Sequence, residues 1–249
     1  EIEAHRPQDA AGTIEESRDV PDHGAAVRLV LATIVDPKLG VLPGLDAIGA
    51  VGHRVVHGGA AFTEPVVVDD VVISAIKECA RFAPLHNPHN LRGIEVAAEA
   101  LPDVPQVAVF DTAFHQSMPR EASAYALPSD LRERLGIRRY GFHGISHKYV
   151  AELAASELGR PLSDLRVVTC HLGNGASVAA GEGGMSVEKG KGFNPLEGRV
   201  MGTRSGDLDP VIVYFIVRFL REVYPASSPA ASAVLERVVQ LTSAYPGIV

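Results

Sequence analysis

Two arginines lie close to glycines in the sequence. Glycines offer an arginine side chain little apolar surface to pack against, so both arginines are candidates for binding an anion. Arg54 lies in the run GHRVVHGG at 52–59, at the end of a β-branched strand pattern. Arg204 lies in the glycine turn MGTRSG at 201–206. A guanidinium group can hold a carboxylate or a phosphate through two parallel hydrogen bonds. A surface ion pair is the alternative role for each arginine.

A second candidate for anion binding is the run VVTCHLGNG at 167–175, where an apolar strand pattern ends in glycines. The continuous run of β-branched and small residues predicts a strand that is covered on both faces. Gly173 and Gly175 can adopt positive φ and let an oxyanion approach the backbone amides, and Asn174 can hydrogen-bond to a ligand. The glycine-rich run at 181–184 predicts a hairpin. An ordinary turn is the alternative to a phosphate site.

Close histidine pairs raise the question of a metal site. The pairs are His53 with His57, His86 with His89, and His143 with His147. No cysteine pair or His-Glu-x-x-His pattern joins them, as a zinc site would need. Histidines in loops that line a site more often donate hydrogen bonds. The serine-hydrolase elbow, the classical P-loop and the dinucleotide fingerprint are all missing from the sequence.

Composition limits the class of protein. The chain has 249 residues, 46% of them hydrophobic, and a formal net charge of −7. An acidic chain argues against a nucleic-acid or anionic-membrane surface, so any anion must be met by a few local arginines. The longest apolar stretch, 211–220, is about half a membrane span and contains Arg218, which predicts a buried helix. We expect a cytoplasmic protein with Cys79 and Cys170 reduced and buried, and no secretory signal is visible.

Strand and helix patterns alternate along the chain, which predicts an α/β fold with mixed sheets. Strands are expected at 48–56, 65–68, 106–110 and 167–170, and helices at 22–31, after Asp69 or Asp70, after Asn87, after Ser129 and after Ser146. Asn87 and Ser146 are predicted to cap the helices that follow them. Asp111 follows a strand at its carboxyl end, where open sheets bind ligands, although it could also cap the next turn. A domain change is expected between Phe114 and Ser129.

Taken together, six blocks in this order and spacing closely resemble the acetate kinase family. They are GHRVVHGG at 52–59, APLHNP at 83–88, VAVFDTAFHQSMP at 107–119, RRYGFHGISHKYV at 138–150, CHLGNGAS at 170–177 and PLEGRVMGTRSGDLDP at 195–210. The resemblance implies an incomplete two-domain, actin-like ATPase fold, related to ribonuclease H, with mixed sheets flanked by helices. It places the acyl substrate on a first domain at 1–115 and the phosphates of ATP on a second domain at 116–249.

The resemblance also implies roles for single residues. Arg54 corresponds to the arginine that binds the carboxylate and the transferring phosphate, Arg204 to its partner across the cleft, Asp111 to the catalytic aspartate, and His143 to the histidine that donates to the phosphoryl group. The phosphate-binding loop for ATP corresponds to His171, Leu172, Gly173, Asn174 and Gly175. The apolar pocket around the methyl group of acetate corresponds to Val56, Leu85, Phe142 and Pro195.

The implied reaction transfers the γ-phosphoryl group of ATP to acetate, reversibly, with Mg²⁺ or Mn²⁺ and with no metal ligand from this chain. Acetate is already ionised at neutral pH and needs no general base, so Asp111 is better placed to orient Arg54 or a metal-bound water. A homodimer is implied, with neither nucleic acid nor membrane as a partner. The alternatives are a propionate or butyrate kinase, or a non-catalytic remnant that binds a nucleotide or a partner.

The chain departs from the family pattern at several points. The asparagine- and serine-rich phosphate turn that opens family members is missing, as are the later adenosine segment and the metal-associated glutamate, so we expect a fragment with weak or absent activity. Ala60 replaces the usual glutamate after the double glycine, and Ile145 replaces a threonine. Lys189 and Lys191 are additional lysines, which could alter substrate handling or simply be solvated. After about Val217 the family pattern can no longer be followed.

Overall fold

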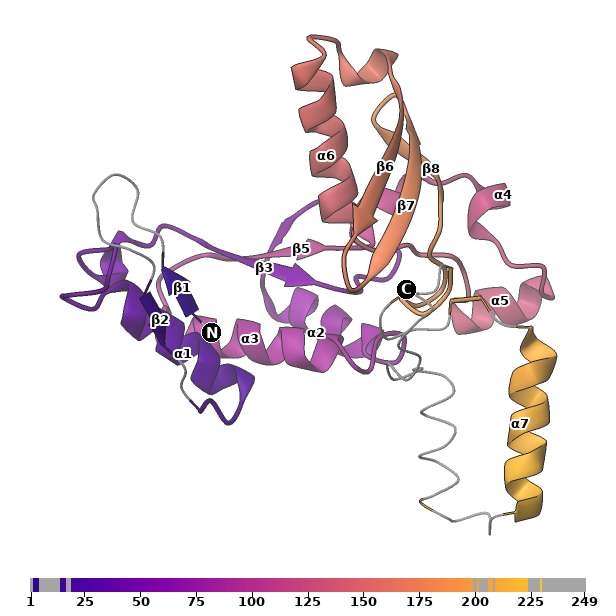
Figure 1. The fold of residues 1–249 in the computed structure, drawn as a ribbon, viewed down its shortest axis with the longest axis horizontal. Coiled ribbons are helices and arrows are strands. Elements are labelled where there is room, and N and C mark those ends of the chain that lie inside the picture. The colour runs from indigo at the N-terminus through magenta and orange to yellow at the C-terminus, as the bar shows by residue number, and fades with distance from the viewer. Residues whose placement is uncertain are drawn as a thin grey trace. The chain divides into compact units, whose positions relative to one another are not determined.

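The chain divides into two compact units, shown in the computed structural model of Figure 1. The first unit comprises Glu1–Gly58 and Glu64–Phe110, and the second comprises Gly59–Thr63 and Asp111–Val249. The structure describes residues 2–4, 14–16, 19–198, 201, 206–207, 209–223 and 229. Within these residues, no helix has both the length and the apolar character that crossing a bilayer requires.

The first unit contains short strands and three α-helices. Its elements are β1 (Ile2–Ala4), β2 (Ile14–Glu16), α1 (His23–Ile34), the 3₁₀ turn η1 (Leu45–Ala47), β3 (Val51–Val55), β4 (Val66–Val67), α2 (Asp70–Cys79), α3 (Asn87–Ala100) and β5 (Gln106–Phe110). β1 and β2 pair antiparallel in a region whose sequence has no apolar periodicity. The other strands and helices lie where the sequence patterns predict them.

A mixed three-stranded sheet forms the centre of the first unit, in the order β3-β5-β4. β3 pairs with β5 in parallel and β4 pairs with β5 antiparallel, which confirms the prediction of a mixed sheet. Figure 1 shows α2 and α3 along one side of β3 and β5. The side chains of Val55, Ile76, Ile94 and Phe110 form the buried core.

α2 follows its sequence prediction closely. The carboxylate of Asp69 accepts a hydrogen bond from the backbone N–H of Val72 at 2.9 Å and so caps the helix. Val72, Ile76 and Cys79 fall on one helical face and are buried. An amphipathic helix needs only this spacing and a cap, and both are local features of the sequence.

Asn87 does not cap α3, which corrects the sequence prediction. It is the first residue of the helix, and the N-cap position belongs to His86, whose side chain makes no capping hydrogen bond. The buried Asn87 amide accepts from the N–H of His57 at 3.1 Å and donates to the carbonyls of His57 (2.9 Å) and Ile76 (3.1 Å). The backbone after β3 needs such partners once it leaves the sheet, and a buried amide supplies them.

The second unit packs helices against an antiparallel sheet. Its elements are η2 (Ala113–Ser117), α4 (Arg120–Ser123), α5 (Ser129–Leu135), α6 (Gly144–Glu157), η3 (Leu162–Asp164), β6 (Arg166–Leu172), β7 (Ala176–Glu182), β8 (Met185–Lys189) and α7 (Pro210–Val223). The sheet has the order β6-β7-β8, and α6 lies along β6 in Figure 1. The predicted hairpin joins β7 to β8 through Gly183 and Gly184, which have φ of 60° and 84°.

β6 is not covered on both faces as the sequence pattern predicts. It is an outer strand that pairs only with β7 among the described strands, and its residues alternate in burial. Val168 is 69% exposed, and Cys170 is exposed although Cys79 is buried as predicted. A continuous apolar run shows that a strand can be buried on both faces. Whether it is buried depends on other segments that pack against those faces.

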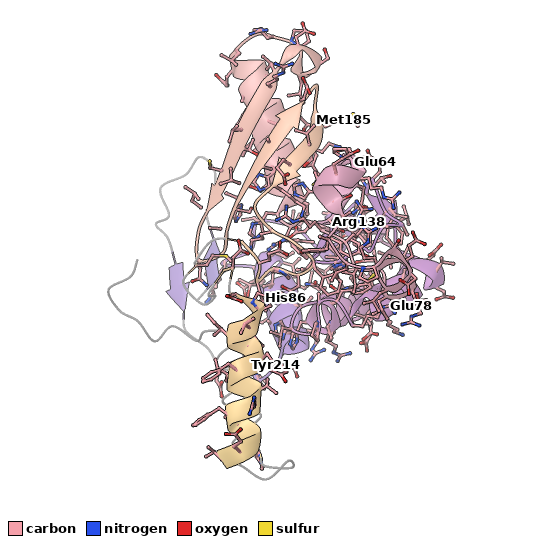
Figure 2. All side chains as sticks on the ribbon, turned by 90° about the vertical axis from the view of Figure 1, so that its right-hand side faces the viewer. Glu64, Glu78, His86, Arg138, Met185 and Tyr214 are labelled. Atoms are coloured by element: carbon pink, nitrogen blue, oxygen red, sulfur yellow. The ribbon has the colours of Figure 1, made fainter. Side chains whose placement is uncertain are left out.

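α7 also differs from its prediction, which was a buried helix. The helix begins as expected, because the carboxylate of Asp209 accepts from the N–H of Val211 at 2.9 Å. Most of its large apolar side chains are exposed, with Tyr214 at 70%, whereas Leu220 is buried. Figure 2 marks Tyr214 on this helix, where side chains stand out on several sides. The described residues therefore leave most of α7 without an apolar neighbour.

Candidate active site

His143 occupies a strained backbone position at the start of α6. It is the N-cap residue and has φ of 58°, the one positive φ among the described residues other than glycine. The next residue, Gly144, donates its N–H to the carbonyl of Asp111 at 2.9 Å. A Cβ atom at Gly144 would overlap that carbonyl oxygen, so the close approach requires glycine. Backbone strain of this kind is often found at functional sites.

Ser146 does not cap α6 but lies in its first turn, which corrects the second capping prediction. The helix begins at Gly144, three residues earlier than a cap at Ser146 implies. The hydroxyl of Ser146 lies 3.0 Å from Nδ1 of His171 on β6. The His171 ring is also close to the His143 ring, with 4.0 Å between centroids and 31° between planes. These contacts bring two predicted site residues together.

Four side chains form what we call the histidine–hydroxyl chain: His143, Ser177, His147 and Thr169. Ser177 Oγ lies 2.8 Å from His143 Nδ1 and 2.7 Å from His147 Nε2. His147 Nδ1 lies 2.7 Å from Thr169 Oγ1, whose hydroxyl in turn donates to the carbonyl of Ala179 at 3.4 Å. All four side chains of the chain are buried.

The direction of each hydrogen bond in this chain assigns the protons. We assign the Thr169 proton to the hydrogen bond with the carbonyl of Ala179, and in this assignment Thr169 accepts from Nδ1–H of His147. Burial, with a contribution from His171, lowers the pKa of His147 to about 4, so its Nε2 is an acceptor at pH 7. Ser177 donates to that nitrogen and accepts from Nδ1–H of His143. A hydrogen bond donated from His143 Nε2 would consequently require the doubly protonated imidazolium form.

His147, Ser177 and Thr169 were not predicted as site residues. A signal for His147 exists, because it follows His143 by four residues and so shares a helix face with it. A signal for Ser177 exists only once the register is known, since His171 and Ser177 are directly opposed in the β6–β7 pair. Such pairing depends on the three-residue loop between the strands, which the sequence pattern did not predict as a hairpin.

His115 connects β8 to the residue before His143. Its Nδ1 lies 2.8 Å from Ser186 Oγ, and its Nε2 lies 3.1 Å from the carbonyl of Phe142, the residue before His143. Burial, with a smaller contribution from Lys189, lowers the pKa of His115 to about 3, so the ring is neutral. A neutral, fully buried ring with both nitrogens engaged acts as a structural support for the backbone at Phe142.

The predicted phosphate loop is the connection between β6 and β7. Gly173 donates its N–H to the carbonyl of Gly175 at 3.1 Å, and Leu172, Gly173 and Asn174 are exposed. Neither Gly173 nor Gly175 has a positive φ, which corrects that part of the prediction. A Cβ atom at Gly173 would meet only the Gly175 carbonyl, at 3.6 Å. Gly173 therefore leaves the backbone of this loop accessible, and it is not needed for a positive φ.

The two additional lysines are not solvated, which removes one of the alternatives for them. Lys189 is 6% exposed and Lys191 is 1% exposed. Lys191 Nζ donates to the carbonyl of Pro195 at 3.1 Å, and Lys189 Nζ donates to the carbonyl of Lys191. Burial lowers the pKa of Lys189 to about 7, with Arg139 the next cause. Lys191 therefore holds Pro195, a residue predicted to line the methyl pocket.

The predicted site residues are divided between the two units. Arg54 on β3, the buried Val56 and the exposed Leu85 belong to the first unit. The second unit holds Asp111, Phe142, His143, His171, Leu172, Gly173, Asn174, Gly175 and Pro195. Of these, Asp111, His143 and His171 are brought together by the contacts above. Arg204 lies outside the described residues.

Comparison with known proteins gives consistent matches. A family model described as the acetokinase family matches residues 4–224. The chain is 59% identical over 199 residues to the acetate kinase of Halothermothrix orenii, covering 80% of this chain and 50% of that protein. It is 57% identical over 213 residues to the acetate kinase of Thermotoga maritima, covering 86% and 52%. The chain thus spans about half the length of these relatives.

The fold of this chain is also similar to the folds of solved structures from the same kind of kinase. The crystal structure of Porphyromonas gingivalis acetate kinase has a TM-score of 0.80 and 41% identity, over 92% of this chain and 55% of that one. A propionate kinase from Francisella tularensis has a TM-score of 0.77 and 39% identity, over 88% and 54%. The fold is accordingly a mixed α/β fold shared with these kinases, as the sequence resemblance implied.

Proposed function

Because the chain belongs to the acetokinase family, we propose that it takes part in transferring the γ-phosphoryl group of ATP to acetate. The reaction is reversible and yields acetyl phosphate and ADP. The observation that carries the proposal is the placement of His143, which is held in a strained conformation beside Asp111 and His171. A histidine fixed in this way can donate to a phosphoryl oxygen without first being ordered.

The charges of the two substrates explain why this chemistry needs cationic groups. Acetate and ATP are both anions, so an in-line attack requires donors that offset their repulsion and hold the reacting oxygens in place. We propose that Arg54 and Arg204 do this together with His143. Negative charge spreads over the equatorial phosphoryl oxygens as the bond to ADP loosens, so donors aimed there stabilise the transition state more than bound ATP.

The proton assignments give His143 a specific role in this proposal. Its Nδ1–H is directed to Ser177, so the imidazolium form is the one that donates from Nε2 to the phosphoryl group. Acetate enters as the carboxylate, and no proton has to be removed from it. Asp111 then acts by orienting a neighbour, and its carboxylate also raises the pKa of His147, although burial lowers that pKa by more.

A divalent cation, Mg²⁺ or Mn²⁺, is the cofactor that the family implies. In the part of the chain that the structure describes, no three His, Cys, Asp or Glu side chains are grouped as a metal site. We propose that the phosphates of ATP hold the cation, with no metal ligand from this chain, and that Asp111 would orient Arg54 or a water bound to the cation. When bound, the cation would offset the charge of the phosphates.

The remaining assignments are proposals of the same kind. We propose a role in binding the acyl substrate for Arg54, Val56 and Leu85, and likewise for Phe142 and Pro195. We propose that the loop from His171 to Gly175 binds the phosphates of ATP, and we keep the predicted domain division at 115/116 as part of the proposal. A cytoplasmic location and a homodimer complete the proposal, with neither nucleic acid nor membrane as a partner.

Propionate is a second candidate acceptor, because a propionate kinase is among the similar structures. One methylene group in an apolar pocket changes binding by only about 1–3 kcal/mol, so a pocket for acetate discriminates modestly against propionate. Comparing acetyl phosphate with propionyl phosphate in the binding experiment below decides between the two acceptors.

Calorimetric titration with ATP and with acetyl phosphate tests the proposal. The chain is expected to bind both ligands, and His143→Ala to weaken acetyl phosphate by at least tenfold, since a charge-assisted hydrogen bond to the phosphoryl group is lost. Arg166→Gln is the matched control, because Arg166 is an exposed cation on the same sheet that pairs with Glu182. A chain that binds neither ligand would be a non-catalytic remnant, and the proposal would be wrong.

A further inference from the structure

A cavity of about 300 Å³ in the second unit is lined by arginines that the proposed reaction does not use. Its lining comprises Ala60, Arg120, Ser123, Ala124, Arg132, Glu133, Gly136, Ile137, Arg138 and Tyr140. None of these residues belongs to the predicted site. We call this cavity the arginine pocket.

The charge of the arginine pocket is strongly positive for an acidic protein. Three arginines line it against one glutamate, although the whole chain has a net charge of −7. Arg120, Arg132 and Arg138 form no ion pair with any residue that the structure describes. The buried Nε atoms of Arg132 and Arg138 also have no hydrogen-bond partner there. The arginines that line the pocket thus carry positive charge that no described side chain offsets in an ion pair, so an external anion is the natural candidate ligand.

The backbone around the arginine pocket is fixed by several hydrogen bonds. α5 ends at Gly136, which has φ of 67°, and the N–H of Ile137 returns to the carbonyl of Arg132 at 2.9 Å. The N–H of Arg139 donates to the carbonyl of Ser123 at 2.7 Å, which ties this segment to the end of α4. These backbone hydrogen bonds therefore fix the shape of the arginine pocket before any ligand binds.

The side chains are held as well. Arg132 Nη1 donates to the carbonyl of Tyr125 at 3.2 Å, and the guanidinium carbon of Arg138 lies 5.7 Å from the centre of the Tyr140 ring. The Tyr140 hydroxyl donates to the carbonyl of Gly136 at 2.8 Å. Figure 2 marks Arg138 in this part of the unit. Protein contacts therefore position the guanidinium groups of Arg132 and Arg138.

Ala60 contributes a small apolar side chain to the pocket, at the position where the sequence departs from the resembling family pattern. A glutamate at this point would place a carboxylate on the rim of the arginine pocket. With alanine there, the rim adds no negative charge and leaves room for a ligand. Ala124 and Ile137 add further apolar surface beside the arginines.

We propose that the arginine pocket is a binding site for a small phosphate monoester, separate in its residues from the proposed site for ATP and acetate. The phosphate dianion would lie between Arg132 and Arg138, since guanidinium groups bind phosphate oxygens in pairs. The short organic part would contact Ala60, Ala124 and Ile137. A cavity of about 300 Å³ is at the lower end for small-molecule sites, which favours a small ligand.

Calorimetric titration with glycerol 3-phosphate tests this site, with inorganic phosphate and acetate at equal ionic strength as comparisons. Glycerol 3-phosphate is expected to bind at least tenfold more tightly than inorganic phosphate, and acetate is not expected to bind there. Arg138→Gln and Ala60→Glu should each weaken binding of glycerol 3-phosphate by at least tenfold. Ala60→Glu keeps all three arginines, so it remains informative if Arg138→Gln does not fold.

Two control variants separate this site from the proposed kinase site. Arg134→Gln removes an exposed cation from the same helix, α5, without touching the pocket lining, and should leave binding unchanged. His143→Ala should also leave the binding of glycerol 3-phosphate unchanged. The inference is overturned if His143→Ala abolishes binding while Ala60→Glu has no effect. It is equally overturned if inorganic phosphate binds as tightly as glycerol 3-phosphate, or if neither binds the unmodified chain.

Discussion

At the scale of single residues, Ser177 decides which nitrogen of His143 carries the proton. Ser177→Ala removes the acceptor of His143 Nδ1–H and the donor to His147 Nε2, so the neutral ring is expected to mix both tautomers. Loss of these two buried hydrogen bonds should also lower the free energy of unfolding by about 1–3 kcal/mol. Ser177→Thr keeps the hydroxyl and should retain the Nδ1–H tautomer.

Nitrogen-15 NMR of the histidine side chains measures this effect directly, because the two ring nitrogens have different shifts in each tautomer. Ser163→Ala, at an exposed serine in η3, is the matched control. An unchanged His143 spectrum in Ser177→Ala would contradict the assigned direction of the hydrogen bonds. A shift in Ser163→Ala would show that the spectrum reports global change rather than the histidine–hydroxyl chain.

Lys191 gives a second prediction at this scale. Lys191→Met replaces a buried ammonium by an apolar side chain of similar length, and we expect the desolvation cost that is removed to exceed the interactions lost, among them the hydrogen bond to Pro195. The melting temperature should rise by about 2–4 °C for each kcal/mol gained. Lys38→Met, at an exposed lysine, should change it little. A lower melting temperature for Lys191→Met would mean that the hydrogen bonds of the ammonium outweigh its desolvation.

At the scale of elements, the start of α6 depends on the absence of a side chain at Gly144. Gly144→Ala would force the helix away from the carbonyl of Asp111, and we expect a loss of about 1–3 kcal/mol in the free energy of unfolding. Gly93→Ala is the matched control, since a Cβ atom there meets nothing within 4 Å in the middle of α3. That change should stabilise the protein by up to about 1 kcal/mol.

Urea denaturation of the two glycine variants measures both effects in one experiment. Movement of His143 in Gly144→Ala should also separate its ring from that of His171, which the histidine NMR spectrum would detect. Equal stability of Gly144→Ala and Gly93→Ala would show that the contact with Asp111 does not constrain α6.

At the scale of the whole molecule, three buried bases make stability depend on pH. His115 and His147 have pKa values of about 3 and 4 when folded, against 6.5 ordinarily, and Lys189 about 7 against 10.5. The unfolded chain therefore binds more protons than the folded chain from about pH 3 to 6.5, and again from about pH 7 to 10.5. Stability should rise with pH across both ranges. The contribution of the two neutral histidines to the free energy of unfolding is complete above pH 6.5 and is lost as the pH falls toward 3.

Urea midpoints of the second unit at pH 5, 7 and 9 check this prediction. The loss from pH 7 to pH 5 should be on the order of a few kcal/mol, because each pKa unit corresponds to about 1.4 kcal/mol. Lys189→Met should flatten the rise between pH 7 and pH 9 and leave the acid side unchanged. Midpoints that are equal at pH 5 and 7 would contradict the buried neutral state of the two histidines.

The sequence by itself determined the features that depend on neighbouring residues. Asp69 caps α2, the apolar residues of α2 share one face, and Gly183 with Gly184 turns β7 into β8, because capping, periodicity and turns are decided within a few residues. The blocks of sequence also identified the family and pointed to His143 and His171. These two residues do lie together.

Only the tertiary structure decided which distant groups meet. Asn87 bonds to residues 30 and 11 positions away instead of capping a helix, and Ser177 meets His143 across 34 positions. The outer position of β6 and the burial of Lys191 likewise depend on which segments pack beside them. Local sequence patterns show which hydrogen bonds a residue can form and whether its side chain can be buried. The packing of distant segments selects which of these possibilities is realised, because it alone sets the distances between their polar groups.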